Sequence, residues 1–307
     1  MKSSKIQVMK KLFLLLIALL AFNTNTHACD KGCTMGGSYF GILPQFHKNF
    51  AGLRYTSRSY TITATHGHHT EITEEHFTTT ELWGRIVPVK NVQVFAFVPY
   101  TFNNQAGSHS TVKSQGFGDV TLLANYSFIN TGDSLRHPLK HTLQLGGGVK
   151  LATGATNIKQ HEETLASNMQ PGTGSTDYLL NGIYTIRYKQ MGLNNDVTYR
   201  FNSENKDGYK FGDRISASSN VFYWQQVGRI SVLPSAGIYY EHAEGDKEHG
   251  VANRQKGGDS YFTNLGLNVY VKNLAIGGTY QLPVSSTEAH HATKGNNRTM
   301  LNLTYMF

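Results

Sequence analysis

Apolar and polar residues alternate along most of the chain from Asn49 onward. Val, Leu, Tyr and Phe recur at every second position, with Gly, Thr, Asn, Ser, Arg or Gln between them. This period of two predicts β-strands with one apolar and one polar face, and no helical period of useful length follows residue 28. The clearest runs are 92–100, 120–128, 143–151, 178–188, 215–223, 261–271 and 274–282.

The runs divide into about twelve predicted strands, an even number as is usual in bacterial barrels. Their expected ranges are 49–66, 73–89, 92–103, 112–130, 138–153, 174–190, 192–203, 208–225, 228–243, 258–272, 274–285 and 295–307. Odd-numbered connections are mostly long and even-numbered ones mostly short, with 131–137 and 204–207 as exceptions. Long loops outside and short turns inside are typical of outer-membrane proteins. We therefore predict an all-β fold, a transmembrane antiparallel up-and-down β-barrel with both termini in the periplasm.

The last predicted strand alternates up to the final residue. Leu301, Leu303, Tyr305 and Phe307 fall on one face. A terminal strand that ends on an aromatic residue looks like the segment read by the barrel assembly machinery, so Tyr305 and Phe307 are the predicted assembly signal. That machinery and outer-membrane lipid are the expected partners. The mean hydropathy of −0.35 is compatible with this prediction, because a barrel crosses a bilayer without a long apolar run.

Two prolines fall inside predicted strands. Pro99 and Pro234 each remove a ladder hydrogen bond, and we expect a bulge at each position.

Residues 1–28 have the pattern of a secretory signal peptide. Four Lys precede the apolar run 12–22, and Thr26-His27-Ala28 offers a small residue for cleavage. The run is too short for a spanning helix. Removing the segment lowers the formal charge from +8 to +4, because it holds four Lys and no acid. A nucleic-acid partner thereby loses its main support. The remaining chain divides into a periplasmic segment, 29–48, and the barrel, 49–307.

The predicted periplasmic segment contains both cysteines, Cys29 and Cys33. Three interpretations stay open: a small disulfide or two idle thiols, lipidation of Cys29, or a soft-metal site. Two thiolates alone are too few ligands for a closed zinc site.

Three short motifs carry a resemblance to a known family. They are Gly116-Phe117-Gly118-Asp119, Gly148-Val149-Lys150-Leu151-Ala152-Thr153-Gly154 and Gln170-Pro171-Gly172-Thr173-Gly174-Ser175-Thr176-Asp177. Over roughly residues 40–307 the chain resembles the meta-pathway phenol-degradation family of outer-membrane proteins, although that family usually has Pro where this chain has Ala152. Residues 36–55 resemble Bacteroidetes-type barrel proteins described as transporters. The resemblance implies a barrel, an outer-membrane location and transport, and it supplies no catalytic residues.

Charged residues on the polar face of the strands are the candidate lining of the lumen. They are Arg54, Arg58, Arg85, Asp119, Lys150, Arg187, Asp196, Arg200, Arg214 and Arg229. The lumen is their natural place, since Arg or Lys facing lipid at mid-depth costs about 2–4 kcal/mol. They either line a pore or pair into a network that fills it. Asp119, Lys150 and Asp177 likewise predict either a salt-bridge network between wall and loop or a contact with substrate.

Histidines gather in or beside the predicted external loops. The sharpest candidates for metal ligands are His66, His68, His69, His290 and His291. Imidazole with neighbouring carboxylates suits Zn²⁺, Cu²⁺ or Ni²⁺, and a solvated polar loop is the alternative. Because the first and last strands of a barrel pair, we expect these histidines to be neighbours at the seam.

The predicted function is that of an outer-membrane channel or transporter for the passive passage of small solutes. The alternative is a closed barrel that binds or has a structural role, with external loops that hold a divalent metal. No enzyme is expected, because the histidines avoid strand centres and no phosphate-binding glycine loop precedes a helix. No cofactor is expected beyond the divalent transition metal. The sequence leaves open the solute, the width of the lumen and the oligomeric state.

Overall fold

The computed structural model describes residues 48–66, 69–108, 110–131, 138–252, 257–285 and 291–307. The predicted signal peptide, Cys29 and Cys33 lie outside these described residues, so the predictions made for them stay predictions.

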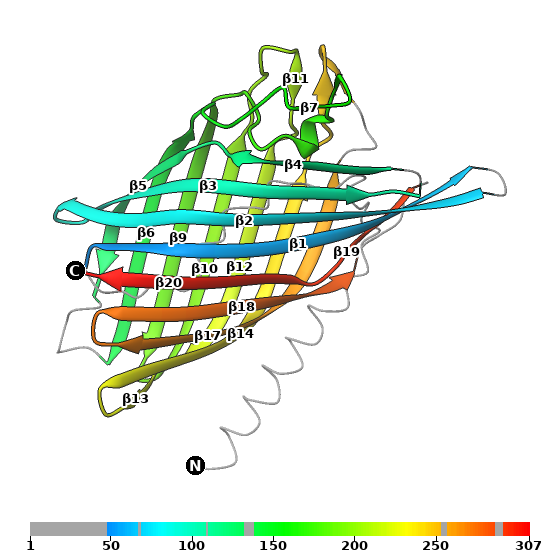
Figure 1. The fold of residues 1–307 in the computed structure, drawn as a ribbon. Coiled ribbons are helices and arrows are strands. Elements are labelled where there is room, and N and C mark those ends of the chain that lie inside the picture. Colours follow the sequence, from blue (N-terminus) through cyan, green and yellow to red (C-terminus); the bar gives the residue numbers. More distant parts are fainter. Residues whose placement is uncertain (1–47, 67–68, 109, 132–137, 253–256, 286–290) are drawn as a thin grey trace.

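Long antiparallel strands form a single closed sheet (Figure 1). In chain order they are β1 (Phe50–His66), β2 (His69–Val89), β3 (Val92–Ala106), β4 (Thr111–Phe117), β5 (Thr121–Asn130), β6 (Leu139–Lys150), β9 (Asp177–Tyr188), β10 (Met191–Phe201), β12 (Arg214–Tyr223), β14 (Ile230–Ala243), β17 (Gly258–Val271), β18 (Leu274–Ser285) and β20 (Arg298–Met306). Each pairs with its neighbours in the chain, and β1 pairs with β20 to close the ring. β4 and β5 pair with successive parts of β3 and together count as one interrupted strand of the barrel, so the barrel has twelve strands.

The two ends of the barrel differ, and we name them by what they carry. The terminal end holds Phe50, Phe307 and the short turns, and in Figure 1 it lies on the side of the C-terminus. The loop end holds η1 (Ser167–Met169) and short strands. These strands are β7 (Lys159–Gln160), β8 (Glu163–Thr164), β11 (Tyr209–Lys210), β15 (Lys247–Glu248), β16 (Val251–Ala252) and β19 (His291–Gly295).

The predicted fold class and strand number are confirmed, and the differences are local. The predicted strand 112–130 is interrupted at residues 118–120, between β4 and β5. The predicted strand 208–225 begins only at Arg214, because Tyr209 and Lys210 pair with β15 in a separate small sheet. The predicted strand 228–243 begins at Ile230, after a turn that connects it to β13 (Gln225–Val227).

The expectation of a bulge is wrong for Pro234 and, on the side of β2, for Pro99, whereas on the other side of Pro99 residues 98–99 face the three residues 118–120. The register of β2 with β3 runs unbroken through Pro99, and that of β14 with β17 runs unbroken through Pro234. Each proline instead lies where the strand on its other side is interrupted. The β3 edge passes from β5 to β4 next to Pro99, and the β14 edge passes from β13 to β12 next to Pro234. A residue without an N–H is tolerated there because the ladder has no acceptor to offer it.

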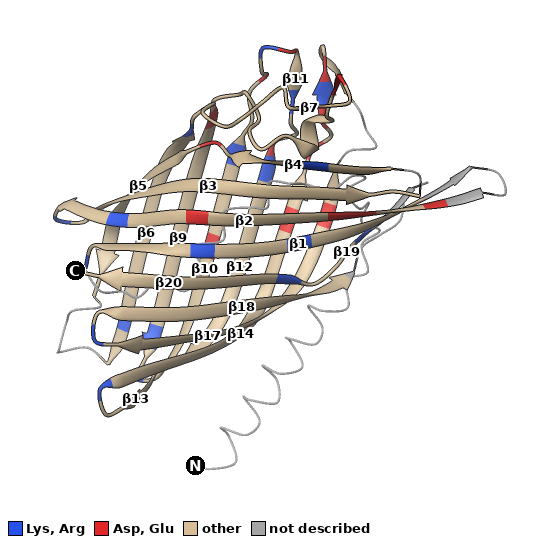
Figure 2. Ribbon diagram, in the orientation of Figure 1, with Lys and Arg blue, Asp and Glu red and all other residues tan. Residues whose placement is uncertain are grey.

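The outer face of the barrel is apolar. Alternation is clear in β5, where every second residue from Leu123 to Ser127 is buried and the residues between them are exposed. Large exposed side chains include Leu53, Leu82, Leu122, Leu145, Leu180, Val197, Val221, Ile238, Leu265, Leu267, Ile276, Leu301 and Leu303. In Figure 2 the middle of the strands is mostly uncharged. A continuous apolar outer surface of this kind is what a barrel presents to lipid.

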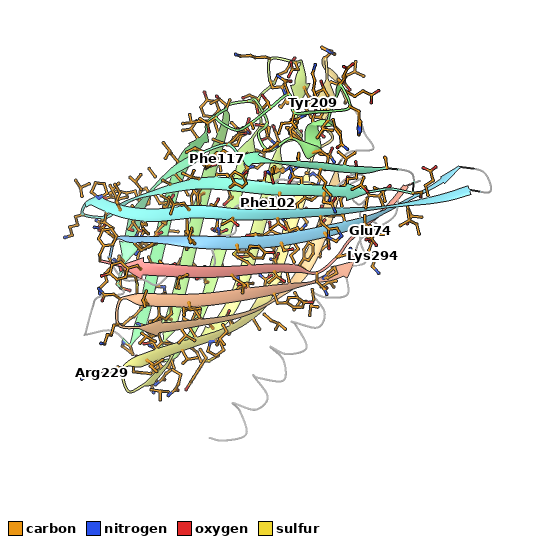
Figure 3. The ribbon with its side chains drawn as sticks, viewed as in Figure 1. Glu74, Phe102, Phe117, Tyr209, Arg229 and Lys294 are labelled. Atoms are coloured by element: carbon orange, nitrogen blue, oxygen red, sulfur yellow. The ribbon has the colours of Figure 1, made fainter. Side chains whose placement is uncertain are left out.

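Aromatic side chains mark both edges of that apolar surface. Toward the loop end, Tyr100 contacts Phe102 and Phe117, with ring centroids 5.1 Å apart in both pairs. Figure 3 shows Phe102 on β3 and Phe117 on β4. Toward the terminal end, Tyr126 and Phe128 have centroids 5.0 Å apart. Amphipathic rings at two levels match the girdles that settle at the boundaries of a membrane. Among the described residues, no helix is long and apolar enough to span a membrane.

Candidate functional site

The inner face of the barrel changes character along its length. We distinguish an apolar layer toward the terminal end, an amide layer midway, and a charged layer toward the loop end. The apolar layer comprises Phe50, Trp83, Phe95, Phe97, Leu123, Phe222, Leu233, Tyr270, Ala275 and Met306, with Trp224 packed against it. Strand geometry decides which residues face inward, and the amino-acid type at each inward position decides whether that level of the lumen is apolar, amide-lined or charged.

The apolar layer is built mainly from rings, and arginines lie on their faces. Phe50 and Trp83 meet edge to face, with centroids 4.7 Å apart. The Arg85 guanidinium lies 5.0 Å from the Phe50 ring centre, and that of Arg187 lies 5.7 Å from the Trp224 ring centre. Cations over aromatic faces are attracted by the ring quadrupole. The layer therefore narrows the terminal end with packed rings and brings positive charge among them.

The amide layer consists of side-chain hydrogen bonds between strands. Asn264 of β17 donates to the Asn220 side-chain oxygen of β12 at 3.0 Å, passing over β14, which lies between these two strands. Gln281 of β18 donates to the Asn264 oxygen at 2.9 Å. Beyond β12, Asn181 of β9 donates to a carboxylate oxygen of Asp196 of β10 at 3.1 Å. Buried amides are costly unless they are bonded, so these contacts keep the polar middle of the lumen compatible with burial.

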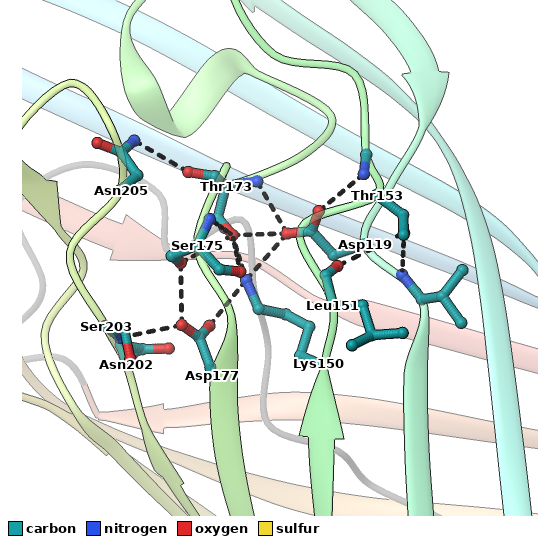
Figure 4. Close-up of polar contacts among 12 residues, drawn as sticks. Asp119, Lys150, Leu151, Thr153, Thr173, Ser175, Asp177, Asn202, Ser203 and Asn205 are labelled. Atoms are coloured by element: carbon teal, nitrogen blue, oxygen red, sulfur yellow. Dashed lines mark hydrogen bonds and ion pairs between the residues drawn. The ribbon is translucent and has the colours of Figure 1, made fainter.

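The charged layer centres on Lys150, the last residue of β6. Its Nζ lies 2.9 Å from Asp119 Oδ2 and 2.7 Å from Asp177 Oδ2, and it donates a hydrogen bond to Thr173 (Figure 4). Strand register explains this meeting, because Lys150 pairs with Asp177 on one side and with Thr121, two residues after Asp119, on the other. The three charges share one inward face and are almost completely buried.

The loop of residues 151–176 is tied to the wall through these acids. The backbone N–H of Gly154 donates to Asp119 Oδ1 at 2.9 Å, and that of Thr173 donates to Asp119 Oδ2 at 2.9 Å. Gly154 and Gly172 approach so closely that a Cβ on either would lie 2.6 Å from the other's backbone. Glycine at both positions lets the loop fold back on itself. These residues belong to the three motifs of the sequence, which meet in one place.

Further ion pairs join the strands around this centre. Arg54 of β1 pairs with Glu81 of β2, and Arg298 Nη1 of β20 lies 3.6 Å from Glu241 Oε2 of β14. Of the two expectations for Asp119, Lys150 and Asp177, the structure contains the salt-bridge network between wall and loop. Contact with a solute stays a prediction.

A cavity of about 170 Å³ lies inside the barrel next to this network. Strands β1, β2, β3, β14, β18 and β20 contribute to its wall, and the loop of residues 151–176 covers part of it. Its charged lining residues are Arg54, Arg58, Glu81, Asp119, Lys150, Arg200 and Arg298. Rings of Phe97, Phe211 and Tyr239 also reach it. The cavity therefore combines several cations with aromatic surface.

Most of the predicted lumen-lining residues lie on the inner face. Arg54, Arg58, Arg85, Asp119, Lys150, Arg187, Asp196, Arg200 and Arg214 are buried or half-buried there. Arg229 is the exception and corrects the prediction. It lies exposed in the turn between β13 and β14 at the terminal end, as Figure 3 shows, because the chain turns at Gly228 and Arg229 instead of continuing as a strand. The pore-lining role of the other residues stays a prediction.

Several inward-facing residues were not anticipated. Arg298 reaches the cavity, Glu75 is fully buried near the loop end, and Met169 of η1 packs against Tyr60 and Phe77. Strand phase would have placed Arg298, since it lies two residues before Met300 on the same face. Met169 carried no such signal, because a loop has no period.

The predicted metal site is only partly within the described residues. His68 and His290 lie outside them, whereas the backbones of His66, His69 and His291 are described. His66 pairs with His69, and His291 of β19 pairs with Ala64 of β1. The expected closure of first and last strands is thus observed in the backbone. Within the described part of the chain, no group of three or more His, Cys, Asp or Glu could hold a metal ion, and metal binding stays a prediction.

A closed barrel with an apolar outer face, two aromatic girdles and a polar interior is the architecture of an outer-membrane β-barrel. This protein has that architecture, lies in the bacterial outer membrane and contacts its lipid through the outer face. No family model matches the chain, and no curated protein matches it. The resemblance to the meta-pathway family therefore stays a prediction.

The first of the following solved structures shares the fold. The COG4313 outer membrane channel from Pseudomonas putida F1 is 13% identical, with a TM-score of 0.61, and the match covers 89% of this chain and 99% of that one. The β domain of the Bordetella autotransporter BrkA is 11% identical (TM-score 0.49; 84% of this chain and 100% of that one). A Pseudomonas aeruginosa FadL homologue is 11% identical (TM-score 0.45; 92% and 98%). At these identities the likeness concerns the fold alone.

Proposed function

We propose that this protein is an outer-membrane channel through which small solutes pass passively. The observation that carries the proposal is the cavity of about 170 Å³, enclosed by the barrel wall and lined by polar and charged side chains. A barrel with a purely structural role is expected to have a fully packed interior, because an unfilled cavity loses van der Waals contacts between its lining side chains. The fold shared with a solved outer-membrane channel supports the same proposal.

The path has two restrictions on either side of this cavity. At the loop end, the loop of residues 151–176 is fastened to the wall by Asp119 and Lys150. At the terminal end, the rings of the apolar layer pack into one cluster on the inner face. Passage requires the rings to change rotamer or the loop to shift, so we expect a low conductance and a preference for small solutes.

One observation favours the alternative of a closed barrel with a binding or structural role. Lys150 is bonded to two carboxylates and to a loop hydroxyl at once, and this network spans wall and loop. A closed barrel would show neither ion current nor solute uptake. The two functions therefore differ in a direct measurement.

Planar-bilayer recording of the refolded protein tests the channel function. We expect discrete conductance steps, together with swelling of liposomes that contain the protein in an iso-osmotic solution of a small solute. The control is the same preparation after heat unfolding in detergent. Folded protein that gives neither current nor swelling would exclude the channel and leave the closed barrel.

We also propose that the terminal aromatic residue acts in assembly. Phe307 follows β20, is 59% exposed, and stacks with Tyr305 at a centroid distance of 6.4 Å. Phe307→Ser should lower the amount of folded, heat-modifiable protein in the outer membrane. Phe128→Ser is the matched control, because Phe128 is 60% exposed on the same outer face. Equal assembly of both variants would contradict a role for Phe307 in recognition by the assembly machinery.

A further inference from the structure

The cavity has more positive than negative side chains. Of the described residues, five basic ones line it, namely Arg54, Arg58, Lys150, Arg200 and Arg298, against the two acids Glu81 and Asp119. The excess remains when three charged residues that lie close to the lining are added. With Arg214, Asp177 and Glu241, the described set has six basic residues against four acids.

The basic residues also lie near one another. Arg58 is within electrostatic range of Arg298, and Arg200 is within range of Arg214. The acids that face these groups are Glu241 near Arg58 and Arg298, and Asp177, Asp119 and Glu241 near Arg200. Like charges that share a space of low dielectric repel each other, and the repulsion is relieved when an anion enters. The excess charge thus favours an anionic occupant.

The remaining lining indicates what kind of anion fits. A guanidinium offers parallel N–H donors that match the two oxygens of a carboxylate. Rings of Phe97, Tyr239 and Phe211 line the same cavity and suit an apolar body. The cavity is smaller than the roughly 300–1,000 Å³ typical of pockets for drug-sized ligands, which restricts the occupant to a small molecule.

The lumen between the cavity and the terminal end also carries an excess of positive charge. Toward the terminal end, Arg54 lies 5.1 Å from the Trp83 ring centre and 5.3 Å from that of Phe97. Arg85 and Arg187 lie on rings still nearer the terminal end. An anion that leaves the cavity therefore meets further arginines among the aromatic side chains, and Asp196 of the amide layer is an acid on the same inner face.

We propose that this cavity selects small organic carboxylates and makes the lumen anion-selective. The selectivity of conduction rests on the proposed channel function, whereas the preference of the cavity for carboxylates does not. Aromatic surface and arginine together bind the apolar body and the charged head of such a solute. A small cation of the same shape is excluded by charge.

The reversal potential across a planar bilayer with a KCl gradient tests the sign of the selectivity. We expect chloride to be about tenfold more permeant than potassium, since a cleft lined by one sign of charge concentrates the opposite ion. Conductance with equal permeability, or with preference for potassium, would overturn the inference and leave the channel intact. Absence of any conductance would overturn the channel, and the binding measurement described below then decides the inference alone.

Single substitutions assign the effect to the cavity. Arg58→Gln and Arg200→Gln should each lower the chloride-to-potassium permeability ratio by about twofold to fivefold, and Arg58→Lys should retain the ratio. Arg229→Gln removes the same charge from an exposed turn and should leave it unchanged. Heat-modifiable migration shows that each variant is folded. An equal fall in the Arg229 variant would place the selectivity at the surface and refute the cavity as its source.

Calorimetry with butyrate, butanol and butylammonium on the folded barrel tests the class of ligand. We expect butyrate to bind at least about tenfold more tightly than either of the other probes, because only butyrate carries the carboxylate. Arg58→Gln and Arg298→Gln should weaken butyrate binding, and Arg229→Gln should not. Equal binding of the three probes, or binding that the Arg229 variant loses equally, would refute the assignment.

Discussion

Toward the terminal end, the lumen is occupied by packed rings, whereas toward the loop end it is crossed by ion pairs and hydrogen bonds. The same strands build both regions, since β2 contributes Trp83 to the first and Glu81 to the second. Apolar packing is non-directional and tolerates rotamer changes. A buried charge network has fixed geometry and a high cost when one partner is lost. The apolar layer is therefore the region whose side chains can change rotamer, and the charged layer is the region that holds the loop of residues 151–176 in place.

Under the proposed channel function, the comparison also explains how a narrow barrel combines stability with passage of a solute. Lys150 fastens the loop of residues 151–176 through Asp119 and Thr173, and the cavity lies beside this fastening. The rings at the other end pack against one another, as Phe50 does on Trp83 and Trp224 on Tyr270. A solute would thus be held at the charged layer and released through the apolar layer.

The largest effect is expected from Lys150→Met. The substitution leaves Asp119 and Asp177 buried close to each other without their cation, which should cost about 3–5 kcal/mol of unfolding free energy. Urea unfolding of the refolded protein in lipid vesicles measures the loss. Lys90→Met, in the exposed turn between β2 and β3, is the control and should cost much less.

A compensating variant distinguishes charge from packing. The triple variant Lys150→Met, Asp119→Asn, Asp177→Asn has no buried charge at this point and should recover part of the stability. If the triple variant is as unstable as Lys150→Met alone, the loss comes from packing and the charged layer is not the rigid region that the comparison requires.

Strand number and strand positions were predictable from the alternation alone. A strand with one lipid-facing side and one lumen-facing side has a strict period of two, and turns separate successive periods. The interruption at residues 118–120 was not predictable, because Gly116 and Gly118 continue the same alternation. The short strands β11, β15 and β16 of the loop end were not predictable either, because they pair with one another and not with the barrel strands.

The charged layer was predictable as a set of residues and not as a set of contacts. Lys150, Asp119 and Asp177 all belong to motifs and to the polar face. Their meeting depends on the register of β5, β6 and β9, which places Lys150 opposite Asp177. Register follows from turns and from the barrel's stagger, and a list of strands does not contain it.

The apolar layer could not be predicted from the sequence for a different reason. In residues 94–98 both faces of the strand are apolar, so Phe95 and Phe97 were indistinguishable from lipid-facing residues. Arg229 shows the converse error. It was assigned to the lumen because its strand was expected to begin two residues before Ile230, whereas it occupies the turn. Alternation gives no information on the first residue of a strand.

A smaller effect on stability is expected from Phe95→Ala in the apolar layer. The loss should stay below the roughly 3–5 kcal/mol of a Phe→Ala change in a sealed core, because water from the lumen can enter the space. Single-channel conductance should rise, since one ring no longer narrows the terminal end. Phe128→Ala on the outer face is the control and should not change conductance. An unchanged conductance in Phe95→Ala would place the narrowest point elsewhere and remove the assignment of the apolar layer as the yielding region.

The smallest effect is expected from Asn264→Ala in the amide layer, between the two regions. Asn264 accepts a hydrogen bond from Gln281 and donates one to Asn220, so its loss leaves a buried donor and a buried acceptor without this partner. The cost should be about 1–2 kcal/mol, because water in the adjoining cavity can replace one contact. Asn268→Ala, on the same face of β17 but outside this chain of amides, should cost less. Urea unfolding compares the two variants. A loss for Asn264→Ala as large as that for Lys150→Met would show that rigidity extends through the amide layer, and the boundary between the two regions would then lie at the rings.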